Sequence, residues 1–258
     1  MDKNLVAYIE LAKEFNRHGY ELYLVGGTVR DYLLNEPLTD MDAVSEATPE
    51  EIIAFLPDID KTFKRFGSLK YKNADGLKFD ITTLRKESSY EDSRHPSKIV
   101  FVKDLKEDYL RRDFTVNALY MNKDLKVIDY CNGQEDLKNN ILRMVGNPDT
   151  RIKEDPLRIL RAIRFASEYG FTIEEKLLNF IKQNKILLDT LSYNRIKEEL
   201  DIIFKNDNKE VGINLLKNIT DAKIRSELNK IDDSLVNQKE KMDIFAQFDI
   251  ANLVGVIK

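Results

Sequence analysis

Three aspartates in the first third of the chain have the type and spacing that metal-dependent chemistry requires. Asp40 and Asp42 are separated by one residue at the strand-like segment 41–44, so both side chains point to the same side. Asp80 lies in a second strand-like segment, 78–82. Adjacent carboxylates repel unless a cation lies between them, and Mg²⁺ combines carboxylates with phosphate oxygens. The spacing favours a magnesium site, although an isolated Asp-x-Asp is more often a turn or a solvated face.

A glycine pair precedes these acids. Gly26 and Gly27 follow the apolar segment 21–25, and twelve residues separate them from Asp40. Glycine lets a backbone come close to a phosphate and leaves N–H groups free to donate to it. A lone Gly-Gly is usually only a turn, but the combination with three acids favours a phosphate-bearing ligand.

A second motif, at residues 111–118, opens with Arg111, Arg112 and Asp113. Arginine forks suit phosphates, and an aspartate can accept a hydrogen bond from a ribose hydroxyl. An ordinary capped turn after a charged helix explains the same residues, so both interpretations stand.

A third motif lies at residues 151–158. Pro156 suits the first turn of a helix, and Asp155 and Arg158, three residues apart, would be neighbours on that helix. Their acceptors and donors could read the edge of a base. The alternative is an intrahelical ion pair worth about 0.2–0.5 kcal/mol.

Composition narrows the class of protein. Hydrophobic residues make up 42% and charged residues 33%, which indicates a soluble globular protein. One cysteine, Cys131, and two histidines exclude an internal disulfide and a cysteine- or histidine-rich metal site. No apolar run approaches the roughly 20 residues of a membrane span, and the first residues do not indicate a secretory signal. The net charge of −4 conceals two basic segments, 61–72 and 151–164, which are typical of backbone contact with nucleic acid or of solvated faces.

Periodicity predicts an α+β fold followed by helices. The 258 residues correspond to roughly one and a half domains. Helices are predicted over 4–17, over 28–34 with Thr28 as a possible N-cap, and from Thr48 to before Pro57; strands are predicted over 21–25, 41–44, 68–71, 77–84 and 99–102, with a hairpin turn at 73–76. These elements indicate a small, largely antiparallel or mixed sheet. After about residue 135 the strand pattern fades and the chain is predicted to be helical.

Together, these motifs resemble those of class II tRNA nucleotidyltransferases, the CCA-adding enzymes, and of bacterial poly(A) polymerases. Residues 24–31 with Asp40 and Asp42 resemble the family's catalytic motif, and residues 111–118 resemble its ribose-selecting motif. The remaining three motifs, for the hinge, the protein template and the last part of the neck, are matched by Asp129, Gly133, Asp136, Leu137, Leu142 and Arg143; by Glu154, Asp155 and Arg158; and by Arg195, Ile196, Glu199 and Leu200. All five occur in the family's order.

The resemblance implies a fold in three parts. A nucleotidyltransferase-type head with a small mixed sheet is expected at residues 1–135, an all-helical neck with a nucleotide-selecting helix at 136–205, and a partial helical body at 206–258. Members of the family usually continue into a tail that grips tRNA, and we expect that tail to be absent here.

The resemblance also implies roles for individual residues. Asp40 and Asp42 would bind Mg²⁺, with Asp80 as a third catalytic acid. Asp113 with Arg112 would hold the ribose 2′-hydroxyl, and Asp155 with Arg158 would pair with the incoming base in place of a nucleic-acid template. The other nucleotide-binding residues would be Gly26, Gly27, Arg30, Arg111, Asn117, Glu154 and Arg161.

The implied reaction is attack of an RNA 3′-hydroxyl on the α-phosphate of CTP or ATP, which releases pyrophosphate and adds CCA to tRNA 3′ ends in the cytoplasm. The polar segment 86–96 would be the flexible loop that the family associates with the change from C to A addition, and it favours addition of the full CCA. Two alternatives stay open: a poly(A) polymerase that extends RNA with ATP, and a non-catalytic RNA-binding remnant. No contact with a membrane is expected.

Overall fold

The computed structural model describes residues 2–90, 96–217, 219, 222–231 and 234–241. The chain divides into two compact units. The first unit contains residues 1–89 and 96–138, and the second contains residues 90–95 and 139–258. The division into head, neck and body at residues 135 and 205 stays a prediction.

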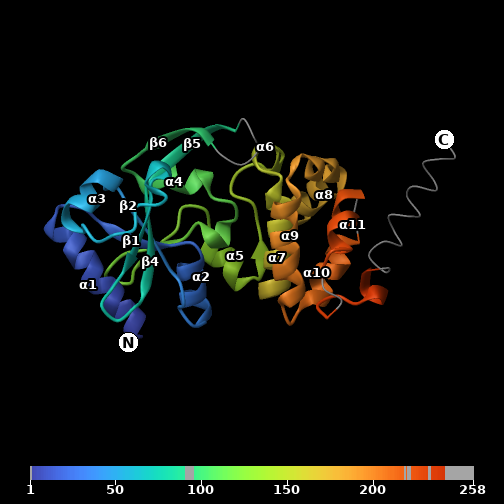
Figure 1. The fold of residues 1–258 in the computed structure, drawn as a ribbon, viewed down its shortest axis with the longest axis horizontal. Coiled ribbons are helices and arrows are strands. Elements are labelled where there is room, and N and C mark those ends of the chain that lie inside the picture. Colours follow the sequence, from blue (N-terminus) through green and yellow to red (C-terminus); the bar gives the residue numbers. More distant parts are fainter. Residues whose placement is uncertain (1, 91–95, 218, 220–221, 232–233, 242–258) are drawn as a thin grey trace. The chain divides into compact units, whose positions relative to one another are not determined.

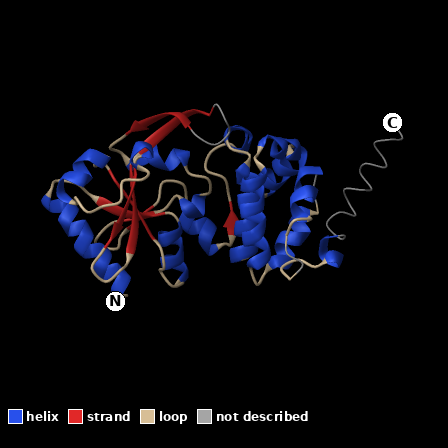
Figure 2. Ribbon diagram, viewed as in Figure 1, coloured by secondary structure: helices blue, strands red, loops and turns tan. Residues whose placement is uncertain are grey.

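The first unit is built on a six-stranded sheet with the strand order β3-β4-β2-β1-β7-β8. Figure 2 draws strands in red. The strands are β1 (Leu22–Val25), β2 (Met41–Ser45), β3 (Ser68–Lys72), β4 (Lys78–Thr83), β7 (Tyr120–Met121) and β8 (Val127–Ile128). Strands β2 and β4 are parallel, and the other neighbouring strands pair antiparallel. The predicted mixed sheet is therefore confirmed, and so is the hairpin turn between β3 and β4.

Helices α1 (Lys3–Arg17) and α3 (Pro49–Phe55) pack against one face of this sheet (Figure 1). Their apolar sides bury Tyr8, Phe15 and Ile52 in one core with residues of β1, β2 and β4. The predicted start of α3 is confirmed: Thr48 and Glu51 form a reciprocal capping box with a proline in the first turn. These local signals explain why the helices form where the sequence places them.

A smaller apolar cluster covers part of the opposite face, with Val25, Val44 and Tyr120 from the sheet. The short elements α4 (Leu105–Asp108) and η2, a 3₁₀ turn (Tyr109–Arg111), add side chains to this cluster. The 3₁₀ turn η3 (Thr115–Asn117) comes next in the chain, and β7 and β8 separate it from α5 (Gly133–Lys138). Helix α5 approaches η3 closely at Gly133, which has no Cβ. A Cβ at this position would lie 2.2 Å from the carbonyl oxygen of Thr115. The Cys131 thiol also contacts this carbonyl, at 3.8 Å.

The predicted loop at 86–96 is partly wrong. Strands β5 (Arg85–Tyr90) and β6 (Pro96–Phe101) form a separate two-stranded sheet, and residues 91–95 lie outside the described residues. The segment 86–90 is polar and lacks an alternating apolar pattern, so its strand pairing was not visible in the sequence.

The second unit is mainly helical, as predicted. Its helices are α6 (Pro148–Glu154), α7 (Leu157–Tyr169), α8 (Glu175–Gln183), η4 (Lys185–Thr190), α9 (Tyr193–Lys205), α10 (Lys209–Leu216) and α11 (Ala222–Leu228). Two short parallel strands, β9 (Ile141–Leu142) and β10 (Thr172–Ile173), correct the expectation of an all-helical region.

Helix α7 packs against α9 and α10, and α9 packs against α11 (Figure 1). A Cβ on Gly212 would lie 2.4 Å from Cγ2 of Ile203, so the glycine permits close packing of α10 against α9. In the part of the chain that the structure describes, none of the helices combines the length and the apolar character that crossing a membrane requires.

Candidate active site

The predicted catalytic acids lie on one face of the sheet in the first unit. Strand β2 runs parallel to β4, and the register places Asp42 opposite Asp80. Side chains alternate across the sheet, so Met41 and Phe79 pack into the core while the neighbouring aspartates point to the other face. Asp40 precedes β2 by one residue and is exposed like Asp42. Strand alternation and register therefore gather three carboxylates from distant parts of the sequence.

The hydroxyl of Thr28 fixes the backbone between two of these acids. It donates to the carbonyl of Asp40 (3.0 Å) and accepts from the N–H of Asp42 (2.8 Å), and Thr28 is only 3% exposed. The prediction that Thr28 caps a helix is wrong, because Gly26 is the N-cap of α2 (Gly27–Leu34). The buried hydroxyl instead sets the positions from which the two carboxylates project.

The surroundings of Asp42 disfavour its charged form. Partial desolvation, and next the Asp80 carboxylate, raise the pKa of Asp42 to about 6, although its side chain still reaches solvent. Asp40 adds to this shift, and the guanidinium groups of Arg112 and Arg30 oppose it without cancelling it. Uncompensated acidic charge of this kind attracts a cation.

The donor set fits a hard divalent cation. All three side chains offer carboxylate oxygens, which Mg²⁺ and Mn²⁺ prefer. Among the described residues, no group of three His, Cys, Asp or Glu side chains is arranged to hold a metal ion by itself. An ion at Asp40 and Asp42 would therefore complete its shell with phosphate oxygens and water.

The glycine pair forms the turn between β1 and α2. Gly26 has a φ of +64°, a conformation that L side chains rarely adopt, and Gly27 is the first residue of α2. A Cβ on Gly26 would lie 3.7 Å from Nη1 of Arg112. The turn thus brings the glycine backbone beside an arginine that is near the acids.

A chain of polar contacts joins three more predicted residues. Arg30 is buried, pairs with Asp31 and donates from Nη1 to Oδ1 of Asn117 (2.7 Å). Asn117 in turn donates to Oδ1 of Asp113 (3.4 Å). These contacts place Arg30, Asn117 and Asp113 in one network of the first unit.

Arg111 and Arg112 are anchored by a buried carboxylate that the motif analysis missed. Asp108 is fully buried and accepts from Nε of Arg111, from Nη2 of Arg112 and from the hydroxyl of Tyr120, each at 2.8 Å. We call these four residues the Asp108 cluster. Burial alone would raise the pKa of Asp108, but the two guanidinium charges outweigh it and hold the pKa well below its ordinary value. An acid three and four residues before two arginines is the sequence signal for this cluster.

A hollow of about 410 Å³ opens at the acids. Besides the three acids, Met41, Asp60, Lys70, Tyr71, Lys72 and Lys78 line it. Lys70 lies on the edge strand β3, and its Nζ is 3.4 Å from Oδ2 of Asp80. The acids are therefore open to a ligand, with lysines on the side of the sheet edge.

The residues predicted to select the base lie in the second unit, where α6 meets α7. Glu154 ends α6, Asp155 follows with an extended backbone, and Pro156 precedes α7. The prediction that Asp155 and Arg158 are neighbours on one helix is wrong, because the helix breaks between them. Asp155 accepts two hydrogen bonds from Nη2 of Arg195 (3.0 and 3.3 Å), and Arg158 donates to Glu154 (3.2 Å).

Arg161 lies one turn along α7 and connects it to α9. Its Nη1 is 3.9 Å from Glu199, whose buried carboxylate also lies 3.3 Å from Nε of Arg164. The Arg161 guanidinium is 5.3 Å from the ring centre of Phe165 and is partly exposed. Arg195 and Glu199, both in the predicted last neck motif, thus hold the α6–α7 junction and α7 in place.

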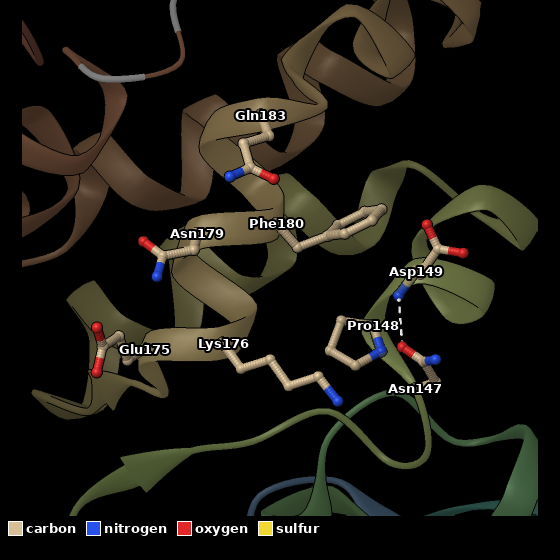
Figure 3. A pocket seen from close by; sticks show the side chains of 8 residues that line it. All are labelled: Asn147, Pro148, Asp149, Glu175, Lys176, Asn179, Phe180 and Gln183. Carbon is tan, nitrogen blue, oxygen red and sulfur yellow. Dashed lines mark hydrogen bonds between the residues drawn. The ribbon is translucent and has the colours of Figure 1, made fainter.

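A second hollow, of about 500 Å³, lies between α6 and α8 (Figure 3). Its lining residues are Asn147, Pro148, Asp149, Glu175, Lys176, Asn179, Phe180 and Gln183. The backbone N–H of Asp149 donates to Oδ1 of Asn147, as Figure 3 shows. None of the predicted nucleotide-binding residues lines this hollow.

Comparison with known sequences places these features in a family. The profile described as the poly A polymerase head domain matches residues 22–143, and one described as a probable RNA and SrmB-binding site of polymerase A matches residues 170–219. A CCA-adding enzyme of Limosilactobacillus reuteri is 40% identical over 215 residues, which cover 82% of this chain and 53% of that protein. The chain belongs to the family of CCA-adding enzymes and bacterial poly(A) polymerases.

Solved structures of this family have the same fold. The Bacillus stearothermophilus CCA-adding enzyme in complex with CTP superposes with a TM-score of 0.82 and 29% identity, over 95% of this chain and 58% of that chain. The Thermotoga maritima CCA-adding enzyme complexed with tRNA has a TM-score of 0.70 and 28% identity, over 88% of this chain and 53% of that chain. Nucleotidyltransferases of this family are generally metal-dependent. The chain spans about half the length of the curated relatives that it matches.

Proposed function

We propose that this chain adds nucleotides from CTP and ATP to the 3′ end of tRNA, builds CCA and releases pyrophosphate. The observation that carries the proposal is the group of three carboxylates on one sheet face, held through Thr28, in a chain 40% identical to a CCA-adding enzyme. With tRNA as its substrate, the enzyme would act in the cytoplasm.

In this proposal Asp40 and Asp42 hold Mg²⁺, and Asp80 supports Asp42 from the adjacent strand. The ion, when bound, lowers the pKa of the attacking 3′-hydroxyl and offsets charge on the leaving pyrophosphate. Thr28 would hold Asp40 and Asp42 in position, because its hydroxyl forms hydrogen bonds with the backbone of both residues. Preorganised placement of this kind supplies a large part of enzymatic acceleration.

The remaining residues of the first unit would bind the nucleotide. The left-handed turn at Gly26 leaves room for a phosphate, and the Asp108 cluster holds Arg112 beside that turn. The Asp113 carboxylate would accept a hydrogen bond from the ribose 2′-hydroxyl. Asn117 and, through it, Arg30 would hold that carboxylate in its orientation. A ribonucleotide would thereby be preferred over a deoxyribonucleotide.

The α6–α7 junction would select the base. Asp155 and Arg158 lie on either side of the helix break and are held by Arg195 and Glu154, respectively. Rigidly held acceptors and donors can distinguish the edges of cytosine and adenine. Arg161, tied to α9 through Glu199, would contribute positive charge nearby on the same helix.

The decisive experiment is extension of a tRNA that lacks its CCA end. Purified protein, Mg²⁺ and labelled CTP or ATP are supplied separately and together, and product lengths are resolved on a gel. Two C additions followed by one A support the proposal. Long A tails with CTP ignored would identify a poly(A) polymerase instead, and RNA binding without any incorporation by folded protein would identify a non-catalytic protein.

Base selection is tested by Arg158→Ala. We expect the ratio of kcat/KM for CTP and ATP over UTP and GTP to fall by about 10-fold or more, because a buried donor to the base is lost. The Mg²⁺ concentration for half-maximal rate should not change. Unchanged nucleotide choice in a folded Arg158→Ala variant would contradict the assigned role.

A further inference from the structure

The basic segment 61–72 lies beside the proposed catalytic acids, and the roles assigned so far do not use it. Strands β3 and β4 carry a group of three lysines, which we call the lysine edge: Lys70, Lys72 and Lys78. The 3₁₀ turn η1 (Lys64–Phe66) and the residues before it carry a second group, the loop cluster: Lys61, Phe63 and Arg65. All of these residues belong to the first unit.

The lysine edge shares a sheet face with the acids. In the antiparallel β3–β4 pair, Lys70 is opposite Asp80 and Lys72 is opposite Lys78. Like charges directly opposite one another destabilise a strand pair. Among the described residues, no carboxylate lies within ion-pair distance of Lys72 or Lys78. Lys72 and Lys78, which have no ion-pair partner among the residues described, therefore face the same hollow as the acids, and a phosphate that contacts both would relieve the repulsion between them.

The two cations of the loop cluster, Lys61 and Arg65, line another hollow, of about 510 Å³, together with Phe101 of β6. Lys64 in this hollow is neutralised by Glu50 at 2.9 Å. By contrast, Lys61 and Arg65 have no carboxylate partner within the part of the chain that the structure describes. Two unneutralised cations at a hollow are suited to the phosphates of a polyanion.

Exposed aromatic rings accompany these cations. Phe63 is 46% exposed and Phe101 is 38% exposed. Rings on a basic surface are the combination with which proteins bind single-stranded nucleic acid, because bases stack on the rings while cations contact the backbone. Aggregation control explains lysines on an edge strand, but it does not explain a large apolar side chain left exposed among them.

Lys70 links Phe63 of the loop cluster to the acids. Nζ of Lys70 lies 5.9 Å from the ring centre of Phe63 and 3.4 Å from Oδ2 of Asp80. Asp80 is itself opposite Asp42. A single-stranded nucleic acid with one base stacked on Phe63 would therefore reach the acids by passing Lys70.

We propose that the loop cluster and the lysine edge bind the single-stranded segment that precedes the reacting 3′ end of the RNA. Phosphates contact Lys61, Arg65, Lys72 and Lys78, and one base stacks on Phe63. This inference rests on the proposed function, since it assigns the path of the RNA substrate to the acids.

The first test measures binding, which needs no turnover. A 5′-fluorescein single-stranded RNA decamer is titrated by anisotropy at several salt concentrations. Lys61→Ala with Arg65→Ala should weaken binding about 5- to 20-fold and lower the slope of log K against log salt by about 1.4, for two lost phosphate contacts at roughly 0.7 each. The matched control, Lys13→Ala with Arg17→Ala on α1, removes the same charge and should leave Kd within about 2-fold.

Phe63 variants separate stacking from charge. Phe63→Ala should weaken RNA binding about 5-fold or more without changing the salt slope, because base stacking does not depend on phosphate charge. Phe63→Tyr keeps an aromatic ring and should restore the affinity. These side chains are exposed, so the variants should keep the thermal stability of the wild type.

Steady-state rates then distinguish the two possible sources of phosphate. With Lys72→Ala and Lys78→Ala, the KM for tRNA should rise about 5- to 20-fold while the KM for CTP at saturating tRNA stays within about 2-fold. A rise in the KM for CTP alone would assign the lysines to the triphosphate and overturn the proposal.

RNA affinity unchanged by the loop-cluster variants, or weakened equally by the α1 control, would overturn it too. A wild-type protein that binds the decamer with the expected salt slope but incorporates nothing contradicts the proposed function and not this surface.

Discussion

Two aspartates in the first unit have opposite electrostatic surroundings. Partial desolvation, and next the like charge of Asp80, raise the pKa of Asp42 to about 6. Asp108 lies among two guanidinium groups and a tyrosine hydroxyl, and its pKa falls well below the ordinary value. The Asp108 cluster is electrostatically complete within the protein. The charges of the acids around Asp42 are not fully neutralised within the protein, so a bound cation would stabilise them. Asp108 instead holds Arg111 and Arg112 in place.

The largest expected effect is a loss of activity on substitution of Asp42. Asp42→Asn should lower nucleotide incorporation about 10³-fold or more, because a proposed metal ligand is lost. The free energy of unfolding should not fall, and it should rise by at most about 1 kcal/mol once solvent screening is allowed for, since repulsion from Asp80 and Asp40 is relieved. Incorporation assays and urea unfolding measure the two effects. A large loss of stability would show that Asp42 belongs with the structural carboxylates.

Asp108→Asn should give the reverse pattern. Removal of the charge leaves Arg111 and Arg112 without their buried partner, and we expect the free energy of unfolding to fall by about 3–5 kcal/mol. Urea denaturation measures this, with Asp58→Asn, an exposed aspartate, as the matched control. An Asp108→Asn protein as stable as the control would remove the contrast between the two regions.

Thr28 tests whether the open acids need a fixed backbone. Thr28→Val keeps the volume but leaves the part-buried N–H of Asp42 without its hydrogen-bond partner, the buried Thr28 hydroxyl. We expect activity to fall about 10- to 100-fold, in line with a loss of about 1–3 kcal/mol for an unsatisfied buried group. The Mg²⁺ concentration for half-maximal rate should rise, and Thr28→Ser should restore both values. A stability loss with an unaltered Mg²⁺ requirement would limit Thr28 to a structural role.

The smallest effect is a pH dependence of stability. The folded pKa of Asp108 is depressed, so its contribution is fully present above the unfolded pKa of about 3.9 and is lost as the pH falls below it. In that window the unfolded chain binds more protons than the folded one. Unfolding free energies measured between pH 5 and pH 2.5 should therefore decline less steeply for Asp108→Asn than for the wild type. Parallel curves would contradict the depressed pKa.

Local patterns predicted most of the fold. The helix stripe that became α1 and the cap at Thr48 are short-range signals, and the structure confirms both. The two-residue strands β9 and β10 and the polar strand β5 escaped prediction, because pairs of that length or polarity carry no periodic pattern. Their formation depends on partners elsewhere in the chain.

The site was predictable where its geometry is local. Asp40 and Asp42 share a sheet face because alternate residues of a strand do, and the sequence reveals this directly. The pairing of Asp80 with Asp42 depends on a parallel register between distant strands, and the bridge made by Thr28 depends on how α2 packs beside β2. The helix break at Asp155 was missed because a proline in the first turn is also compatible with a continuous helix start.

Cys131, which contacts the Thr115 carbonyl next to α5, has a practical consequence. Burial, and next the Asp129 carboxylate, raise the pKa of its thiol to about 12, so the sulfur stays protonated and poorly nucleophilic at neutral pH. Cysteines introduced at exposed sites, such as Val6→Cys in the first unit and Ile186→Cys in the second, would react with maleimide dyes ahead of it. Because Cys131 is the single cysteine of the chain, a pair of dyes at two introduced cysteines could report fluorescence energy transfer between the two units, with and without added CTP or ATP.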